Sequence, residues 1–144
     1  MLSDGRVFEA EKFVVASGID SYNVCKTLGW RPPLWPVKGY TVNVKFSENF
    51  RPKHAMHLNS NESLYLTPIG DEYRITKYNV ISPWDDTEVN ETFIEKTITA
   101  VKKIYSEEVI DYSSSWAGRR PVSADDLPII GRIDPYENLY INTG

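Results

Sequence analysis

Apolar and polar residues alternate strictly from Tyr40 to Phe46. A period of two places all the apolar side chains of a strand on one face, so this segment predicts a half-buried antiparallel strand. Further short strands are expected where apolar runs are separated by Asn, Gly and Pro. These expected strands cover residues 54–58, 63–67, 73–80 and 109–114.

Between the last two expected strands, apolar positions recur every three to four residues, which is typical of a helix. Asn90 can cap its N-terminus, and Lys102 and Lys103 near its end suit the helix dipole. The apolar stripe consists of Phe93, Ile94, Ile98, Val101, Ile104 and Tyr105. Strands, then a helix, then a strand predict an α+β fold, a mainly antiparallel sheet covered on one face by a long helix.

The first 36 residues have a different pattern. Residues 5–18 predict a short hairpin arm and then a buried strand, Phe13 to Ser17, which ends in a glycine turn. Asp20 or Ser21 can cap a short helix that ends before Gly29. Three prolines in residues 31–36 argue against helix and central strand there, so this segment is expected to cross into a second region that starts near Val37.

Composition narrows the class of protein. Of 144 residues, 41% are hydrophobic and 25% charged, which is ordinary for a soluble globular domain, and no apolar run approaches membrane-spanning length. The net charge of −4 argues against nucleic acid as a partner. The single cysteine, Cys25, excludes an intramolecular disulfide and is expected to be buried in the short helix.

The segment from Trp116 to Arg132 carries the most specific chemistry. Arg119 and Arg120 stand beside a glycine and a proline, in what the sequence predicts to be a turn-rich segment. A guanidinium group binds a carboxylate through two parallel hydrogen bonds, so it holds and orients a substrate that has one. The alternative is a surface loop whose arginines pair with Asp125 and Asp126.

Several ordered motifs resemble the C-terminal part of the FAD-dependent amino-acid oxidoreductases, which include D-amino acid dehydrogenase, glycine oxidase and sarcosine oxidase. The order is V-V-A-S-G at 14–18, L-W-P-V-K-G-Y at 34–40, W-A-G-R-R-P at 116–121, L-P-I-I-G-R at 127–132 and N-L-Y-I-N-T-G at 138–144. Taken together, the sequences of these motifs are most similar to those of D-amino acid dehydrogenase. The resemblance runs from about Gly5 to Gly144.

The glycine fingerprint of the family, G-x-G-x-x-G, does not occur, because no two of the eight glycines are separated by one residue. The resemblance therefore implies the substrate-domain portion of a longer enzyme. Residues 1–36 would be a remnant of the FAD-binding domain, residues 37–120 the substrate-binding domain, and residues 121–144 a truncated return into the FAD-binding domain. Alone, such a fragment is expected to be inactive and to hold no FAD, and its partner would be the missing remainder of the enzyme.

The resemblance also implies roles for single residues. Arg120 would receive the carboxylate of an amino-acid substrate, and the Tyr65 hydroxyl would reach the same group; the alternative for Tyr65 is a strand tyrosine packed in the core. Arg119 is expected to face outward. Lys77 stands where relatives usually turn with glycine, which is a departure from the family. The residues expected beside FAD are Ala16, Ser17, Gly18, Lys38, Gly39, Ile130 and Gly131.

The implied activity is oxidative deamination of D-amino acids to 2-oxo acids and ammonia, in the cytoplasm or on the cytoplasmic face of the inner membrane. The electron acceptor, oxygen or a quinone, stays open. So do a related glycine or sarcosine oxidase and a non-catalytic module that binds a ligand or partner. No catalytic group is assigned. His54 and His57 are not expected to bind metal, and the acidic pairs at 85–86 and 125–126 are expected to be solvated turn residues.

Overall fold

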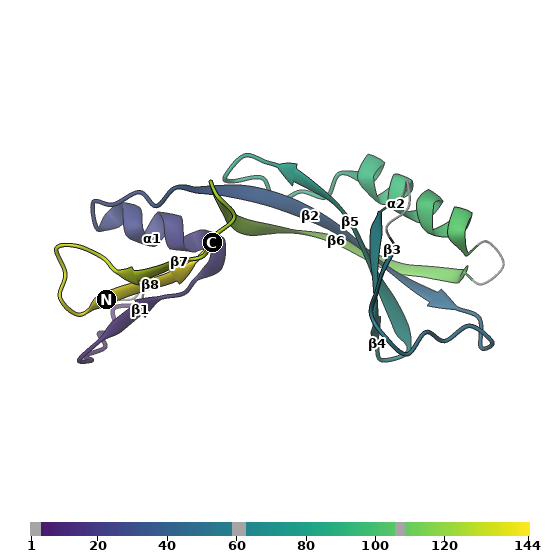
Figure 1. Ribbon diagram of the computed structural model, residues 1–144, viewed down its shortest axis with the longest axis horizontal. Helices are drawn as coiled ribbons and strands as arrows, with labels where there is room; N and C mark the ends of the chain where they lie inside the picture. Colours follow the sequence, from purple (N-terminus) through teal and green to yellow (C-terminus); the bar gives the residue numbers. More distant parts are fainter. Residues whose placement is uncertain (1–3, 59–62, 106–108) are drawn as a thin grey trace. The chain divides into compact units, whose positions relative to one another are not determined.

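The computed structural model describes residues 4–58, 63–105 and 109–144 (Figure 1). The chain forms two compact units, one made of Met1–Trp35 with Arg120–Gly144 and the other of Pro36–Arg119. We call them the terminal unit and the central unit. The elements in chain order are β1 (Phe13–Val15), η1 (Gly18–Asp20), α1 (Ser21–Thr27), β2 (Leu34–Phe46), β3 (Met56–Leu58), β4 (Leu64–Ile69), β5 (Glu72–Ile81), α2 (Glu91–Ile104), β6 (Val109–Ser123), β7 (Ile129–Arg132) and β8 (Leu139–Thr143).

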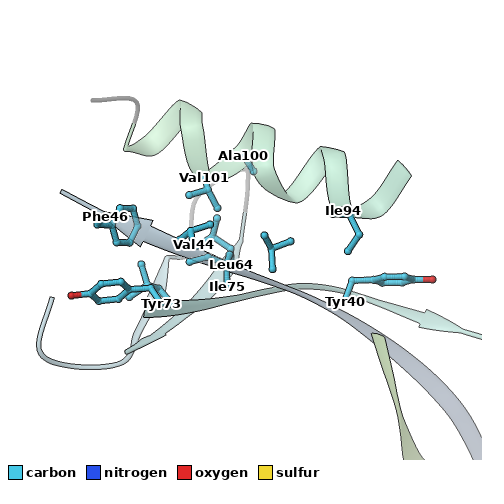
Figure 2. Packing of buried hydrophobic residues seen from close by; sticks show 11 residues of the cluster. Tyr40, Val44, Phe46, Leu64, Tyr73, Ile75, Ile94, Ala100 and Val101 are labelled. Atoms are coloured by element: carbon cyan, nitrogen blue, oxygen red, sulfur yellow. The ribbon is translucent and has the colours of Figure 1, made fainter. Parts of the chain in front are cut away.

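The central unit is built on a five-stranded sheet with the order β3-β4-β5-β2-β6. The pairs β3–β4, β4–β5 and β2–β5 are antiparallel. Its core lies on one face, where the buried apolar residues of the strands meet helix α2. Figure 2 shows Ile94, Ala100 and Val101 pointing from α2 toward the strands. The alternation predicted from Tyr40 to Phe46 is confirmed, because all four apolar side chains of that segment are buried.

Helix α2 begins as the sequence predicts. The Asn90 side chain accepts a hydrogen bond of 3.0 Å from the backbone N–H of Thr92 and so satisfies one of the free donors at the helix N-terminus. Lys102 and Lys103 lie in the last turn. The predicted architecture, a mainly antiparallel sheet with a helix on one face, is therefore what the central unit has.

The terminal unit contains a three-stranded sheet with the order β1-β8-β7. Strand β1 is parallel to β8, and β7 is antiparallel to it. Cys25 of α1 packs with Ile133 and Ile141 and is fully buried, as predicted. Burial raises the pKa of its thiol, which fits a structural role and not that of a nucleophile.

The hairpin and the buried strand predicted for residues 5–18 are wrong. Strand β1 is only three residues long, is an edge strand, and pairs with β8 from the other end of the chain. Phe13 and Val14 are 40% and 62% exposed. An apolar run predicts a strand but does not specify which surface covers it, and the described elements cover little of β1.

One further boundary differs from expectation, and one predicted helix cap lacks its hydrogen bond. Strand β2 begins at Leu34 and includes Pro36, so the end of the predicted crossover is already strand. Proline is tolerated there because it lies before the paired stretch that opens at Val37, and the carbonyl of Pro36 accepts a hydrogen bond from Ser82. Asp20 stands at the N-cap position of α1 without a side-chain capping bond, while Gly29 has the expected positive φ of 83°.

Candidate active site

The end of strand β1 leads into a glycine turn in the terminal unit. Gly18 has a φ of 59°, and its carbonyl accepts a hydrogen bond of 3.2 Å from the Thr143 hydroxyl at the end of β8. Beside this turn lies a hollow of about 410 Å3, lined by Val14, Val15, Ala16, Ser17 and Val24. Two of the residues predicted to lie beside FAD, Ala16 and Ser17, therefore line a surface hollow.

Ile130 and Gly131 lie on β7, in the same sheet as that turn. Gly131 is in register with Ile141, which in turn is in register with Val15 of β1. Ile130 is 69% exposed, and a side chain added at Gly131 would meet no described atom within 4 Å. The backbone at Gly131 therefore leaves open space on its surface, where another group could approach closely.

The motif with the two arginines is strand and not turn. Strand β6 continues to Ser123, so the expected turn-rich segment around Arg120 is wrong. Pro121 fits because β6 lies at the edge of its sheet, where a missing N–H donor is tolerated. Arg120 itself is exposed.

The sequence predicted that Arg119 faces outward, and this prediction is wrong. Arg119 is half-buried, and its guanidinium donates a hydrogen bond to the backbone carbonyl of Trp84 in the central unit. Successive residues of a strand point to opposite faces, so Arg119 and Arg120 project in different directions. Arg119 therefore fixes the loop before α2. Arg120, the more exposed of the two, is the residue predicted to bind substrate.

Lys38 is buried in the central unit, although lysine is seldom buried unless it is paired. Its ammonium group donates to the carboxylate of Asp86 at 2.5 Å and to the carbonyl of Glu88. The hydrogen bond from Lys38, with a further contribution from the charge of Arg119, holds the pKa of Asp86 below its usual value. Asp86 is partly exposed, and its carboxylate accepts a hydrogen bond from the backbone N–H of Glu88, as expected of a turn residue. The sequence did not predict that the same carboxylate neutralises a buried cation.

Tyr65 lies on β4 with its side chain on the face of the sheet opposite α2. Its neighbours in sequence, Leu64 and Leu66, are fully buried, whereas Tyr65 is 53% exposed. Its ring stacks on that of His57, with centroids 4.2 Å apart and planes at 7°. The alternative of a core tyrosine is thus excluded, and the Tyr65 side chain is accessible.

The same side of the central sheet carries a set of polar side chains, which we call the polar face: Thr41, Asn43, Tyr65, Thr67, Arg74, Thr76 and Trp116. The hydroxyls of Thr41 and Thr76 lie 3.3 Å apart, and the Asn43 amide donates to the Ser114 hydroxyl at 3.0 Å. The guanidinium carbon of Arg74 lies 5.5 Å from the centre of the Trp116 ring.

Arg74 was not singled out from the sequence. The alternation of side chains along β5 could have shown that Arg74 points away from the core, as Tyr65 does on β4. Its neighbours, however, follow only from the register of β5 against β2 and β4. That register contains a bulge between Gly39 and Tyr40. Opposite it, Tyr78 has a φ of 66°, which is rare for a bulky residue, next to the Lys77 that departs from the family pattern.

Sequence comparison supplies the family. The family model described as DAO, FAD dependent oxidoreductase, matches residues 2–144. The chain belongs to this family of FAD-dependent oxidoreductases. It is similar to D-amino acid dehydrogenases of Rhizobium johnstonii, 29% identical over 147 residues, and of Paramagnetospirillum magneticum, 29% identical over 143 residues. These alignments cover 100% and 99% of the chain but only 34% and 33% of the relatives, so the chain spans about one third of the length of the curated relatives it matches.

Two solved structures of glycine oxidases share the fold. Glycine oxidase from Geobacillus kaustophilus superposes with a TM-score of 0.72 at 21% identity, over 95% of this chain and 36% of its own. Glycine oxidase from Bacillus cereus gives a TM-score of 0.71 at 26% identity, over 93% and 36% of the two chains. The mixed α+β architecture is thus shared with these two oxidases. Among the helices that the structure describes, none has the length and hydropathy needed to span a bilayer.

Proposed function

We propose that this chain belongs to an enzyme that oxidises D-amino acids to 2-oxo acids and ammonia. The observation that carries the proposal is the whole-chain similarity to two D-amino acid dehydrogenases, combined with a sheet face that presents an accessible tyrosine at the position expected for substrate contact. The central unit, Pro36–Arg119, would be the substrate-binding part. The terminal unit would belong to the FAD-binding domain.

In this proposal, Arg120 receives the α-carboxylate of the substrate. A guanidinium donates two parallel N–H bonds in one plane, so it fixes both the position and the rotation of the carboxylate. The Tyr65 hydroxyl would donate a hydrogen bond to a carboxylate of the substrate. Holding a substrate in reactive orientation lowers the barrier by several kcal/mol, which is the contribution these two residues would make.

The terminal unit has features that fit FAD. Ligands of open α/β sheets bind beyond the carboxyl ends of parallel strands, and the hollow beside Ala16 and Ser17 lies at that end of β1, the strand parallel to β8. The glycine turn at Gly18 allows a bound group to approach the backbone. When bound, FAD supplies the acceptor for the hydride that leaves Cα.

The residues predicted to contact FAD differ in what they could offer it. The ammonium group of Lys38 is already bound to Asp86 and to the Glu88 carbonyl, so Lys38 would act by shaping the nearby backbone, including Gly39, rather than by a direct charge contact. Ile130 and Gly131 would offer an exposed apolar side chain and an open backbone. The pyrophosphate turn would come from residues outside these 144, because no G-x-G-x-x-G occurs among them.

Glycine oxidation is a second candidate, favoured by the similarity to glycine oxidases of known structure. The two functions differ in whether the substrate has a side chain at Cα. The FAD-loaded protein that contains this chain should therefore be assayed with D-alanine, L-alanine and glycine, and both 2-oxo acid and ammonia should be measured.

The proposal predicts product from D-alanine and much less from L-alanine. Preference for glycine would support the second candidate, and no product from any amino acid would contradict both. Repeating the assay with oxygen and with a soluble quinone as the only acceptor separates an oxidase from a dehydrogenase.

A further inference from the structure

Arg74 is a half-buried cation at the centre of the polar face. Strand register places it opposite Asn43 of β2 on one side and Thr67 of β4 on the other. Tyr65 is its diagonal neighbour on β4, at a spacing that long side chains can bridge. Arg74 thus shares a surface with the tyrosine that the proposed function assigns to substrate.

One polar group of Arg74, its Nε, is not satisfied by the described part of the chain. Its Nε is buried and has no hydrogen-bond partner, and none of its nitrogens forms an ion pair with a carboxylate of residues 4–58, 63–105 or 109–144. The hydrogen bonds recorded for the nearby amide and hydroxyl groups go elsewhere: the Asn43 amide donates to Ser114, and the hydroxyls of Thr41 and Thr76 bond to each other. A buried donor without a partner is rare in native proteins and calls for an anion or water that completes it.

Trp116 holds the guanidinium in place. The guanidinium carbon lies 5.5 Å from the centre of the indole, a distance at which the ring attracts a cation. The ring can lie there because residue 118 is glycine: a Cβ at Gly118 would come within 2.6 Å of Cζ3 of Trp116. A cation–π contact of this kind uses none of the N–H donors of the guanidinium for a hydrogen bond, so these donors can still bind a second partner.

We propose that Arg74 binds a second carboxylate of the substrate, the one in its side chain, so that the preferred substrates are D-amino acids with an acidic side chain. The inference rests on the proposed function, in which the Tyr65 hydroxyl contacts the amino-acid substrate. Arg74 then determines specificity. A dicarboxylic substrate would supply the charge and the acceptors that the polar face lacks.

The first test compares D-glutamate with D-glutamine, which match in size and differ in charge, in the FAD-loaded protein that contains this chain. The inference predicts that Arg74→Gln lowers the ratio of kcat/KM for D-glutamate over D-glutamine by about tenfold or more, because a charged hydrogen bond is lost. Lys45→Gln is the matched control, since Lys45 is an exposed cation on the same strand as Asn43, and it should leave the ratio unchanged. An equal ratio in the wild type and Arg74→Gln would overturn the inference.

The second test does not depend on turnover. The Nε–Hε signal of Arg74 in the 15N-labelled chain, assigned through its loss in Arg74→Lys, should shift saturably with glutarate and much less with acetate. No shift with glutarate would overturn the inference. If no D-amino acid is oxidised, the proposed function fails, and this titration alone decides whether Arg74 binds a dicarboxylate.

Discussion

Tyr65 and Leu66 are adjacent in β4 but lie on opposite faces of the central sheet. A substitution at Leu66 should therefore reduce stability, whereas a substitution at Tyr65 should reduce catalysis. Leu66 is fully buried and in register with Ile75, in the core beneath α2. Tyr65 is 53% exposed and rests on His57. We compare Leu66→Ala with Tyr65→Phe, which removes only the hydroxyl.

The expected magnitudes follow from burial. Leu66→Ala removes three buried carbon atoms worth about 0.8 kcal/mol each, and the cavity left in a packed core raises the loss to about 3–4 kcal/mol. The Tyr65 hydroxyl is on an accessible ring, so Tyr65→Phe should change the free energy of unfolding by about 0.5 kcal/mol or less. The same change should lower kcat/KM for a D-amino acid by about tenfold, the cost of one hydrogen bond to a charged group.

Equilibrium unfolding in urea, followed by circular dichroism and by tryptophan fluorescence, gives the two free energies. Steady-state kinetics of the FAD-loaded protein gives the effect on catalysis. A loss of stability in Tyr65→Phe as large as that in Leu66→Ala would refute the assignment of the two faces. An unchanged kcat/KM in Tyr65→Phe would remove its hydroxyl from the substrate site.

Two predictions concern the segment that leads into α2. The pKa of Asp86 is lower in the folded protein than in the unfolded chain, so its contribution to stability is complete above the ordinary carboxyl pKa, about 3.9, and is lost as the pH falls through the lowered value. Asp86→Asn should therefore reduce the urea midpoint at pH 7 and lessen the further loss on going to pH 3; an acid dependence identical to that of the wild type would contradict the ion pair with Lys38. Asn90→Ala should destabilise the protein by about 1 kcal/mol and Asn90→Gly by only a few tenths, because glycine is the better N-cap of the two; equal losses in the urea midpoints would show that the cap contributes nothing.

The central unit follows its sequence closely because its signals are local. The period of two from Tyr40 to Phe46 specifies both a strand and its buried face. The stripe around Ile94 and Val101, with Asn90 as cap, specifies a helix that needs one apolar surface. Local pattern and tertiary packing agree at these positions, so the sequence alone was sufficient.

The remaining features depend on contacts between distant segments, which a local pattern does not contain. The pairing of β1 with β8 joins the two ends of the chain. Two hydrogen bonds link a strand to the loop before α2: one from Arg119 to the Trp84 carbonyl, and one from Lys38 to the Asp86 carboxylate. The sequence does not reveal that Arg119 is the arginine that holds this loop. The Gly-Arg-Arg-Pro segment was predicted to be a turn because its residue types favour turns, but an edge strand also tolerates them.

The central claim is that Arg120 binds the carboxylate of a D-amino acid while bound flavin is reduced. Anaerobic stopped-flow mixing of the FAD-loaded protein with a D-amino acid measures this step through the loss of visible flavin absorption. For Arg120→Lys, which keeps the charge but not the paired donors, we predict a fall of about a hundredfold or more in the second-order rate constant of flavin reduction. The same rate constant in Arg120→Lys and in the wild type would contradict the account.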